Sequence, residues 1–92
     1  MAPELEDVLR KKWGLPLLRL LDEEDELNFS VMENELGISS STLTQTKNLL
    51  VECGLVKRNE LKRTDIRYEL TPNGEKFLQK IGELEEILDG QD

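Results

Sequence analysis

Several residue types that carry chemistry are rare or absent in this chain. The 92 residues include no histidine, one cysteine and only 4% aromatic side chains. The sequence lacks a ligand cluster for a metal, a Gly-rich phosphate loop and a nucleophile beside a base. No apolar run approaches the roughly 20 residues of a membrane span, and the start of the chain lacks a signal-peptide pattern. We therefore expect a cytoplasmic protein without membrane contact, enzymatic activity or cofactor.

The lone cysteine, Cys53, cannot form a disulfide within the chain. Leu49, Leu50, Leu55 and Val56 surround it in the sequence. These apolar neighbours favour a packed thiol over a redox switch.

Basic residues are outnumbered: 12 lysines and arginines stand against 20 acidic residues, which gives a net charge of −8. This charge opposes the basic footprint expected of a nucleic-acid-binding protein. Its distribution is uneven, because residues 37–67 carry six basic and three acidic residues, a net charge of +3. The remainder carries six basic and 17 acidic residues, a net charge of −11. Since salt screens charges over about 8 Å, a local basic patch can hold DNA beside a distant acidic surface.

Residues 30–53 are typical of a helix-turn-helix, in which two helices meet at a tight turn. Ser30 and Glu33 match a capping box, which predicts a first helix over residues 31–36 with a left-handed end at Gly37. The second helix is predicted over residues 39–53.

The second helix has two distinct faces. Leu43, Thr46 and Leu50 recur at helical spacing, so this face is expected in the core. The opposite face carries short uncharged polar side chains, which can contact base edges and phosphates in a DNA major groove. These are Ser40, Ser41, Thr44, Gln45 and Asn48, with Lys47 at the edge.

Two helices are predicted before this motif, over residues 3–12 and 16–22. A break is expected near Leu15, because proline disfavours helical geometry in the residue that precedes it. The acidic run of residues 22–26 is predicted to be a solvated loop, followed by a short extended piece at residues 27–29.

A two-stranded β-hairpin, or wing, is predicted over residues 55–70. Residues 55–60 indicate one strand, and alternating apolar and charged side chains over residues 66–70 indicate its partner. The residues between them lack the Asn-Gly signal of a tight turn, which predicts a longer loop. Lys62 and Arg63 in this loop suit contact with phosphates or the minor groove, although a solvated loop would have the same composition.

The last predicted helix covers residues 72–89, with Thr71 as N-cap and Pro72 at its first position. Its apolar side chains form two adjoining columns, whereas packing against the core of the domain needs only one. We therefore predict a homodimer formed by this helix and the first helix. The expected contacts are Leu5, Val8, Leu9, Phe77, Ile81, Leu84 and Leu88.

Four short motifs stand out: Lys12-Trp13, Gly37-Ile38-Ser39, Glu52 to Arg58, and Tyr68 to Gly74. In these motifs and in the order of its elements, the chain resembles the winged-helix transcriptional regulators of the MarR and HxlR type. The resemblance implies a prokaryotic homodimer that binds palindromic operators in double-stranded DNA and represses or activates nearby genes. The cysteine that the HxlR group often carries before its Lys-Trp segment is missing here, so no thiol sensor is implied. Any small-molecule effector would bind at the dimer interface.

The sequence thus predicts a single domain over residues 1–92, mainly α with a small β-hairpin (α+β), folded as a winged helix-turn-helix. We expect a sequence-specific transcriptional regulator that places helix 39–53 in the major groove and wing residues 57–67 on the flanking backbone. The alternative is an acidic winged-helix module for protein–protein interaction without DNA binding. In the first case phosphates would be held by Lys47, Arg58, Lys62, Arg63 and Arg67.

Overall fold

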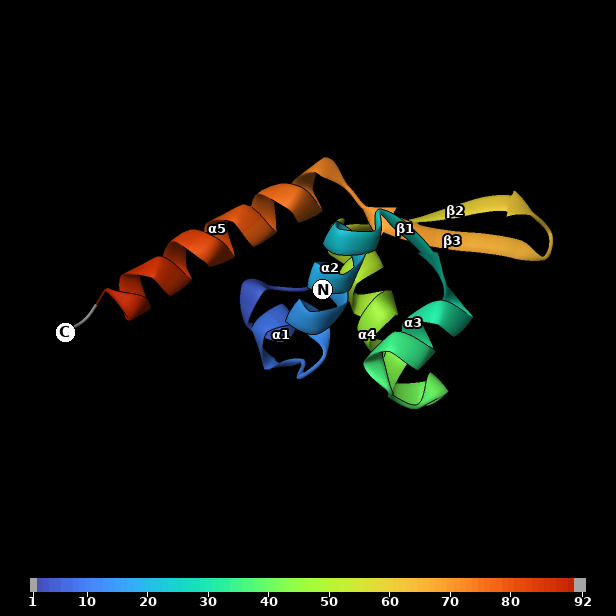
Figure 1. Cartoon of the computed structure of the whole chain (residues 1–92), viewed down its shortest axis with the longest axis horizontal. Coiled ribbons are helices and arrows are strands. Elements are labelled where there is room, and N and C mark those ends of the chain that lie inside the picture. The colour runs from blue at the N-terminus through green and yellow to red at the C-terminus, as the bar shows by residue number, and fades with distance from the viewer. Residues whose placement is uncertain (1, 91–92) are drawn as a thin grey trace.

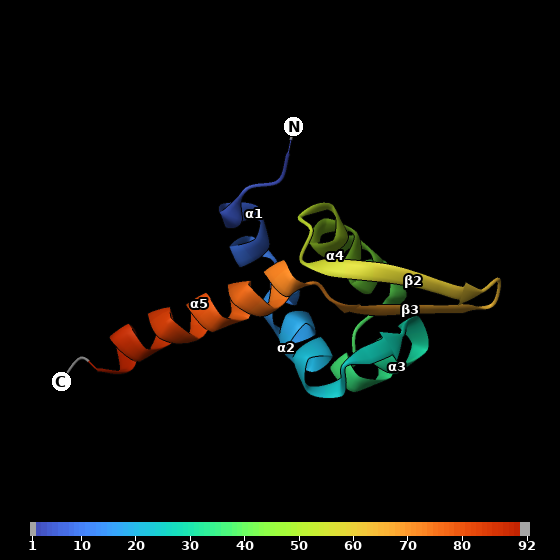
Figure 2. The same cartoon turned by 90° about the horizontal axis from the view of Figure 1, so that it is seen from above.

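The computed structural model describes residues 2–90, which form five helices and a three-stranded antiparallel sheet (Figures 1 and 2). The predicted α+β winged-helix class is confirmed. Helices α1 to α4 gather at the centre, the β2–β3 hairpin projects on one side and α5 on the other, so the molecule is elongated, 51 × 30 × 24 Å. The order is α1 Leu5–Arg10, α2 Gly14–Glu24, β1 Glu26–Asn28, α3 Phe29–Leu36, α4 Ser40–Glu52, β2 Val56–Lys62, β3 Asp65–Leu70 and α5 Pro72–Asp89.

Helix α2 is the centre of the hydrophobic core. Its side chains Leu17, Leu18 and Leu21 are fully buried, and Met32 of α3 and Leu43 of α4 join the same cluster. Helix α2 also contacts β3 and α5. The helix-turn-helix, the sheet and α5 are therefore all held against one apolar helix.

The first two helices differ from their predicted bounds. Helix α1 is shorter than expected, and it begins with a capping box in which the Asp7 carboxylate accepts a hydrogen bond from the Glu4 backbone N–H at 2.7 Å. The predicted break between the two helices exists, but it lies at residues 11–13 and not near Leu15, because α2 already begins at Gly14. Pro16 falls in the first turn, where its missing N–H would have had no partner within the helix.

The acidic run of residues 22–26 is not the loop predicted from its composition. Helix α2 continues to Glu24, Asp25 reverses the chain with a φ of 65°, and Glu26 begins β1. The helix buries its leucines on one face and leaves the carboxylates of residues 22–25 exposed. Charge on the solvent face therefore does not stop the helix.

Helix α3 begins two residues before the predicted start. Asn28 rather than Ser30 caps it, because the Asn28 Oδ1 accepts a hydrogen bond from the Val31 N–H at 3.0 Å. Strand β1 pairs with β3 as far as Asn28, so the chain leaves the sheet and enters the helix at adjacent residues. The predicted left-handed end at Gly37 is confirmed by its φ of 64°.

The wing is the outer part of a three-stranded sheet with the order β1-β3-β2. Strands β2 and β3 pair from Val56 opposite Leu70 to Lys62 opposite Asp65, with a register shift between Glu60 and Lys62. Only residues 63 and 64 lie between the strands, so the predicted longer loop is wrong. A bulge increases the local twist of a hairpin, which lets the strands continue to a short turn without an Asn-Gly pair.

Helix α5 is attached to the body by hydrogen bonds of its first turn and by apolar side chains that include the buried Ile81. The Thr71 hydroxyl accepts a hydrogen bond from the Gly74 N–H at 3.0 Å and donates one to the Gly54 carbonyl at 2.6 Å. Farther along, Glu85 forms an ion pair with Arg19 of α2 at 2.8 Å. The end of α5 then extends away from the other elements (Figures 1 and 2). Within residues 2–90 no helix has the length and hydrophobicity that crossing a membrane requires.

Candidate nucleic-acid interface

Helix α4 is held firmly by its buried face. Its N-terminus is capped by Ser39, whose Oγ accepts a hydrogen bond from the Thr42 N–H at 3.2 Å. Leu43 and Leu50 are fully buried, and Thr46 between them is also buried. The Thr46 hydroxyl donates to the Thr42 carbonyl at 2.9 Å, so this polar group has a partner inside the core. The orientation of the opposite face is thereby determined.

That opposite face is polar and carries little charge. Ser41, Gln45 and Asn48 are exposed and form one stripe along the helix. Ser40 is also exposed, but its hydroxyl donates a hydrogen bond to the Glu33 carboxylate of α3. Thr44 is half-buried. The stripe therefore offers amide and hydroxyl groups to a partner, which suits contact with base edges.

Lys47, expected at the edge of this stripe, is directed toward the sheet. Its Nζ lies 3.3 Å from the Tyr68 hydroxyl and donates a hydrogen bond to it. The same atom lies 5.2 Å from the centre of the Tyr68 ring and 5.7 Å from the centre of the Phe29 ring. Lys47 is half-buried as a result.

Two of the arginines expected to hold phosphates are paired with carboxylates of the sheet itself. Arg58 lies 3.3 Å from Glu60, and the Arg67 Nε lies 3.1 Å from Asp65. Glu26 of β1 is 3.6 Å from Arg67 on its other side. The hydrogen bond and the charge of Asp65 raise the pKa of Arg67 above its ordinary value. Exposed pairs of this kind stabilise little, but they reduce the positive charge that the sheet presents.

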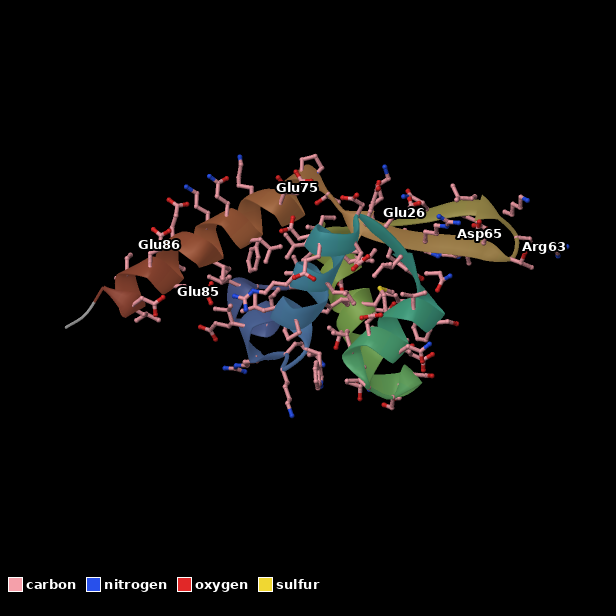
Figure 3. All side chains as sticks on the ribbon, viewed as in Figure 1. Glu26, Arg63, Asp65, Glu75, Glu85 and Glu86 are labelled. Carbon is pink, nitrogen blue, oxygen red and sulfur yellow. The ribbon has the colours of Figure 1, made fainter. Side chains whose placement is uncertain are left out.

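The cations at the tip of the wing differ from these arginines. Lys62 and Arg63 are exposed, and neither forms an ion pair with any residue in the described range 2–90. Figure 3 shows Arg63 pointing outward at the end of the hairpin, whereas Asp65 and Glu26 lie farther back. Of the labelled carboxylates of α5, Glu85 and Glu86 lie toward the opposite end of the molecule, and Glu75 lies near its middle.

The wing tip and the helix-turn-helix share one end of the molecule. Helices α3 and α4 lie on the same side of the centre as the wing, and the end of α5 points the other way (Figures 1 and 2). The sheet links the two features directly, because β1 ends where α3 begins and α4 contacts β2. A polar helix stripe and two cations without ion pairs in the described range are thus carried by elements that contact one another.

This arrangement agrees with the comparison of the sequence with known families. The profile of the HxlR-like helix-turn-helix family matches residues 8–91. The chain belongs to this family. Its members are DNA-binding transcription regulators, and the resemblance to the HxlR type seen in the short motifs is confirmed.

Among curated proteins, Uncharacterized protein MJ0944 from Methanocaldococcus jannaschii is 38% identical over 86 residues. The match covers 89% of this chain and 71% of that protein. No solved structure matches the chain at a significant level.

The HxlR-like chain also exposes apolar side chains on α1 and α5. Those of α5 include Leu84 and Leu88, which are 56% and 69% exposed. Two residues predicted at the dimer contact are instead buried within the chain: Val8 is 2% exposed and Ile81 is 8% exposed. The prediction is wrong for these two because α1 and α5 each turn one apolar column inward to the core. Phe77 is half-buried.

The remaining apolar surface is continuous with a groove. A hollow of about 400 Å³ lies where α1, the end of α4 and α5 meet, and Leu5 and Leu84 help to line it. Leu9 is also exposed on α1, and Ile87, which lies beside the expected contact residues, is exposed on α5. The spacing of residues 84, 87 and 88 places them on one side of the helix.

Proposed function

We propose that the chain is a sequence-specific transcriptional regulator that binds DNA as a homodimer. Each α4 would enter a major groove, with the two copies about 34 Å apart, and each wing would contact the flanking backbone. The exposed stripe of α4 would read bases through Ser41, Gln45 and Asn48. The apolar residues of α1 and α5 would form the subunit contact, because a helix face with several large exposed apolar side chains commonly marks an interface.

The main support for the proposal is that some cations of the wing form ion pairs with carboxylates and others do not. Lys57 pairs with Glu69 at 3.4 Å, and the two arginines of the strands pair with neighbouring carboxylates. Lys62 and Arg63 have no such partner among residues 2–90, and they lie within residues 37–67, which carry a net charge of +3. Cations left free on an acidic protein suit the neutralisation of phosphates.

The test is a DNA titration at several salt concentrations with Lys62→Glu/Arg63→Glu. Each lost phosphate contact lowers the slope of log affinity against log salt by about 0.9, so the double variant should lose about 1.8. The matched control is Lys76→Glu/Lys80→Glu, which makes the same change in charge on α5. The control should bind as the wild type does, provided that light scattering shows the same molar mass. Equal binding by the wild type and the wing variant would refute the role of the wing.

Base reading requires a separate test. Replacing Gln45 with alanine should change the preference among DNA sequences, because a bidentate hydrogen bond to a base disfavours the wrong base by about 1–3 kcal/mol. Its affinity for random DNA should change little. If the wild type shows no salt-dependent binding to any DNA, the protein–protein interaction module becomes the better description, with its acidic surface as the binding face.

A further inference from the structure

Lys47 occupies a core-facing position on the recognition helix. It lies four residues after Leu43 and three before Leu50, which are both fully buried. This spacing places all three on one side of α4 and turns Lys47 away from the stripe that holds Gln45. A lysine at such a position must extend its ammonium group along the protein surface or bind it within the protein.

The structure shows the second arrangement. The Lys47 ammonium group lies within cation–π distance of two rings, those of Phe29 and Tyr68, and it also donates to the Tyr68 hydroxyl. Tyr68 is only 5% exposed, and Lys47 is the only side chain within residues 2–90 that hydrogen-bonds its hydroxyl. If Lys47 turned toward DNA, this buried hydroxyl would lose its partner, which is unfavourable.

The three residues belong to three different elements. Phe29 is the first residue of α3, Lys47 lies in the middle of α4, and Tyr68 is in β3, where it pairs with Leu27 of β1 and Arg58 of β2. One ammonium group therefore joins the supporting helix, the recognition helix and the central strand of the sheet. We propose that Lys47 is a positioning residue, held between Phe29 and Tyr68, that sets α4 against the wing and does not itself contact a phosphate.

This proposal rests on the proposed DNA-binding function, and the experiment separates the two. In the free protein, NMR should show the ε-methylene protons of Lys47 upfield of those of Lys57 and Lys62, because they lie near two ring faces. Replacing Phe29 with leucine should reduce this shift. An ordinary position for the Lys47 signal would overturn the proposal whether or not DNA is bound.

In DNA titrations, Lys47→Met keeps the apolar stem and removes the ammonium group, with its charge and its hydrogen bond to Tyr68. We expect affinity to fall about fivefold, the factor that corresponds to one cation–π contact, with the salt slope unchanged. Lys62→Met is the matched control, and its slope should fall by about 0.9. A slope for Lys47→Met that falls as it does for Lys62→Met would show a phosphate contact and overturn the proposal.

The last arm uses Tyr68→Phe, which removes the hydroxyl and keeps the buried ring. If Lys47 acts through Tyr68, the variant with both changes should bind no more weakly than Lys47→Met alone. Additive losses would contradict the positioning role. If the wild-type protein shows no salt-dependent DNA binding, the proposed function is refuted. The NMR measurement would still decide whether Lys47 is held by the rings.

Discussion

Two glycines of α5 should respond in opposite ways to the same substitution. A Cβ added at Gly74 would lie 2.1 Å from the Leu55 carbonyl oxygen, whereas a Cβ at Gly82 would meet no atom within 4 Å. Real Cβ atoms essentially never approach another atom more closely than 3.0 Å, so Gly74→Ala must displace either Leu55 or the start of α5. The Leu55 oxygen also accepts a hydrogen bond from the Thr71 N–H at 3.0 Å, and this bond would be strained.

The expected magnitude follows from these contacts. Overpacking of this kind costs about 1–3 kcal/mol, and the weakened hydrogen bond adds about 1 kcal/mol. We therefore expect Gly74→Ala to lower the free energy of unfolding by about 3 kcal/mol. In Gly82→Ala the better helix propensity of alanine acts alone, so stability should rise by about 1 kcal/mol.

The assay is urea unfolding of both variants at one fixed protein concentration, followed by circular dichroism. Thermal unfolding provides a check, since 1 kcal/mol shifts the Tm of a domain of this size by about 4–8 °C. A Gly74→Ala variant as stable as the wild type would refute the close packing of α5 on Leu55, in the segment between α4 and β2. The same result would remove the physical reason for glycine in the Thr71 to Gly74 motif.

Three further predictions concern the subunit contact, the core and the thiol. Replacing Leu88, which is 69% exposed, with glutamate should convert the proposed dimer to a monomer in light scattering while leaving the helical circular dichroism unchanged. Leu50→Ala should lower the free energy of unfolding in urea by about 2–5 kcal/mol, because Leu50 is fully buried. Burial, and then the charges of Glu52 and Asp7, raise the pKa of Cys53 above its ordinary value of 9.0. Iodoacetamide should therefore alkylate Cys53 more slowly than a small free thiol at pH 8, and Glu52→Gln should speed the reaction; a rate equal to that of the free thiol would contradict this environment.

Local signals in the sequence identified several elements because the physics behind them is local. Thr71 before Pro72 predicted the start of α5, and the hydroxyl of Thr71 caps that helix as expected. Gly37 predicted a left-handed turn, since glycine adopts positive φ at little cost. By contrast, the predicted capping box at Ser30 is wrong, because the end of β1 determined where α3 begins and Asn28 caps it.

The candidate interface was predictable only in part. The helical period alone separates the exposed Gln45 from the buried Leu43. It could not show the second partner of Arg67, because Glu26 is distant in the sequence and reaches Arg67 only through the pairing of β1 with β3; the nearer partner, Asp65, is only two residues away. Likewise, Phe29 approaches Lys47 only after α3 and α4 have packed together.

The sequence by itself determined the family, the helical periods and the uncharged face of the recognition helix, because these depend on residues close together in the chain. Tertiary structure decided which cations stay free. Strand register brings the distant Glu26 to Arg67, and packing brings the rings of Phe29 and Tyr68 to Lys47. Arg58 pairs within its own strand with Glu60, and Lys62 and Arg63 stay exposed at the tip. Ionic and cation–π contacts act over a few ångströms, so they follow from positions in space and not from positions in the chain.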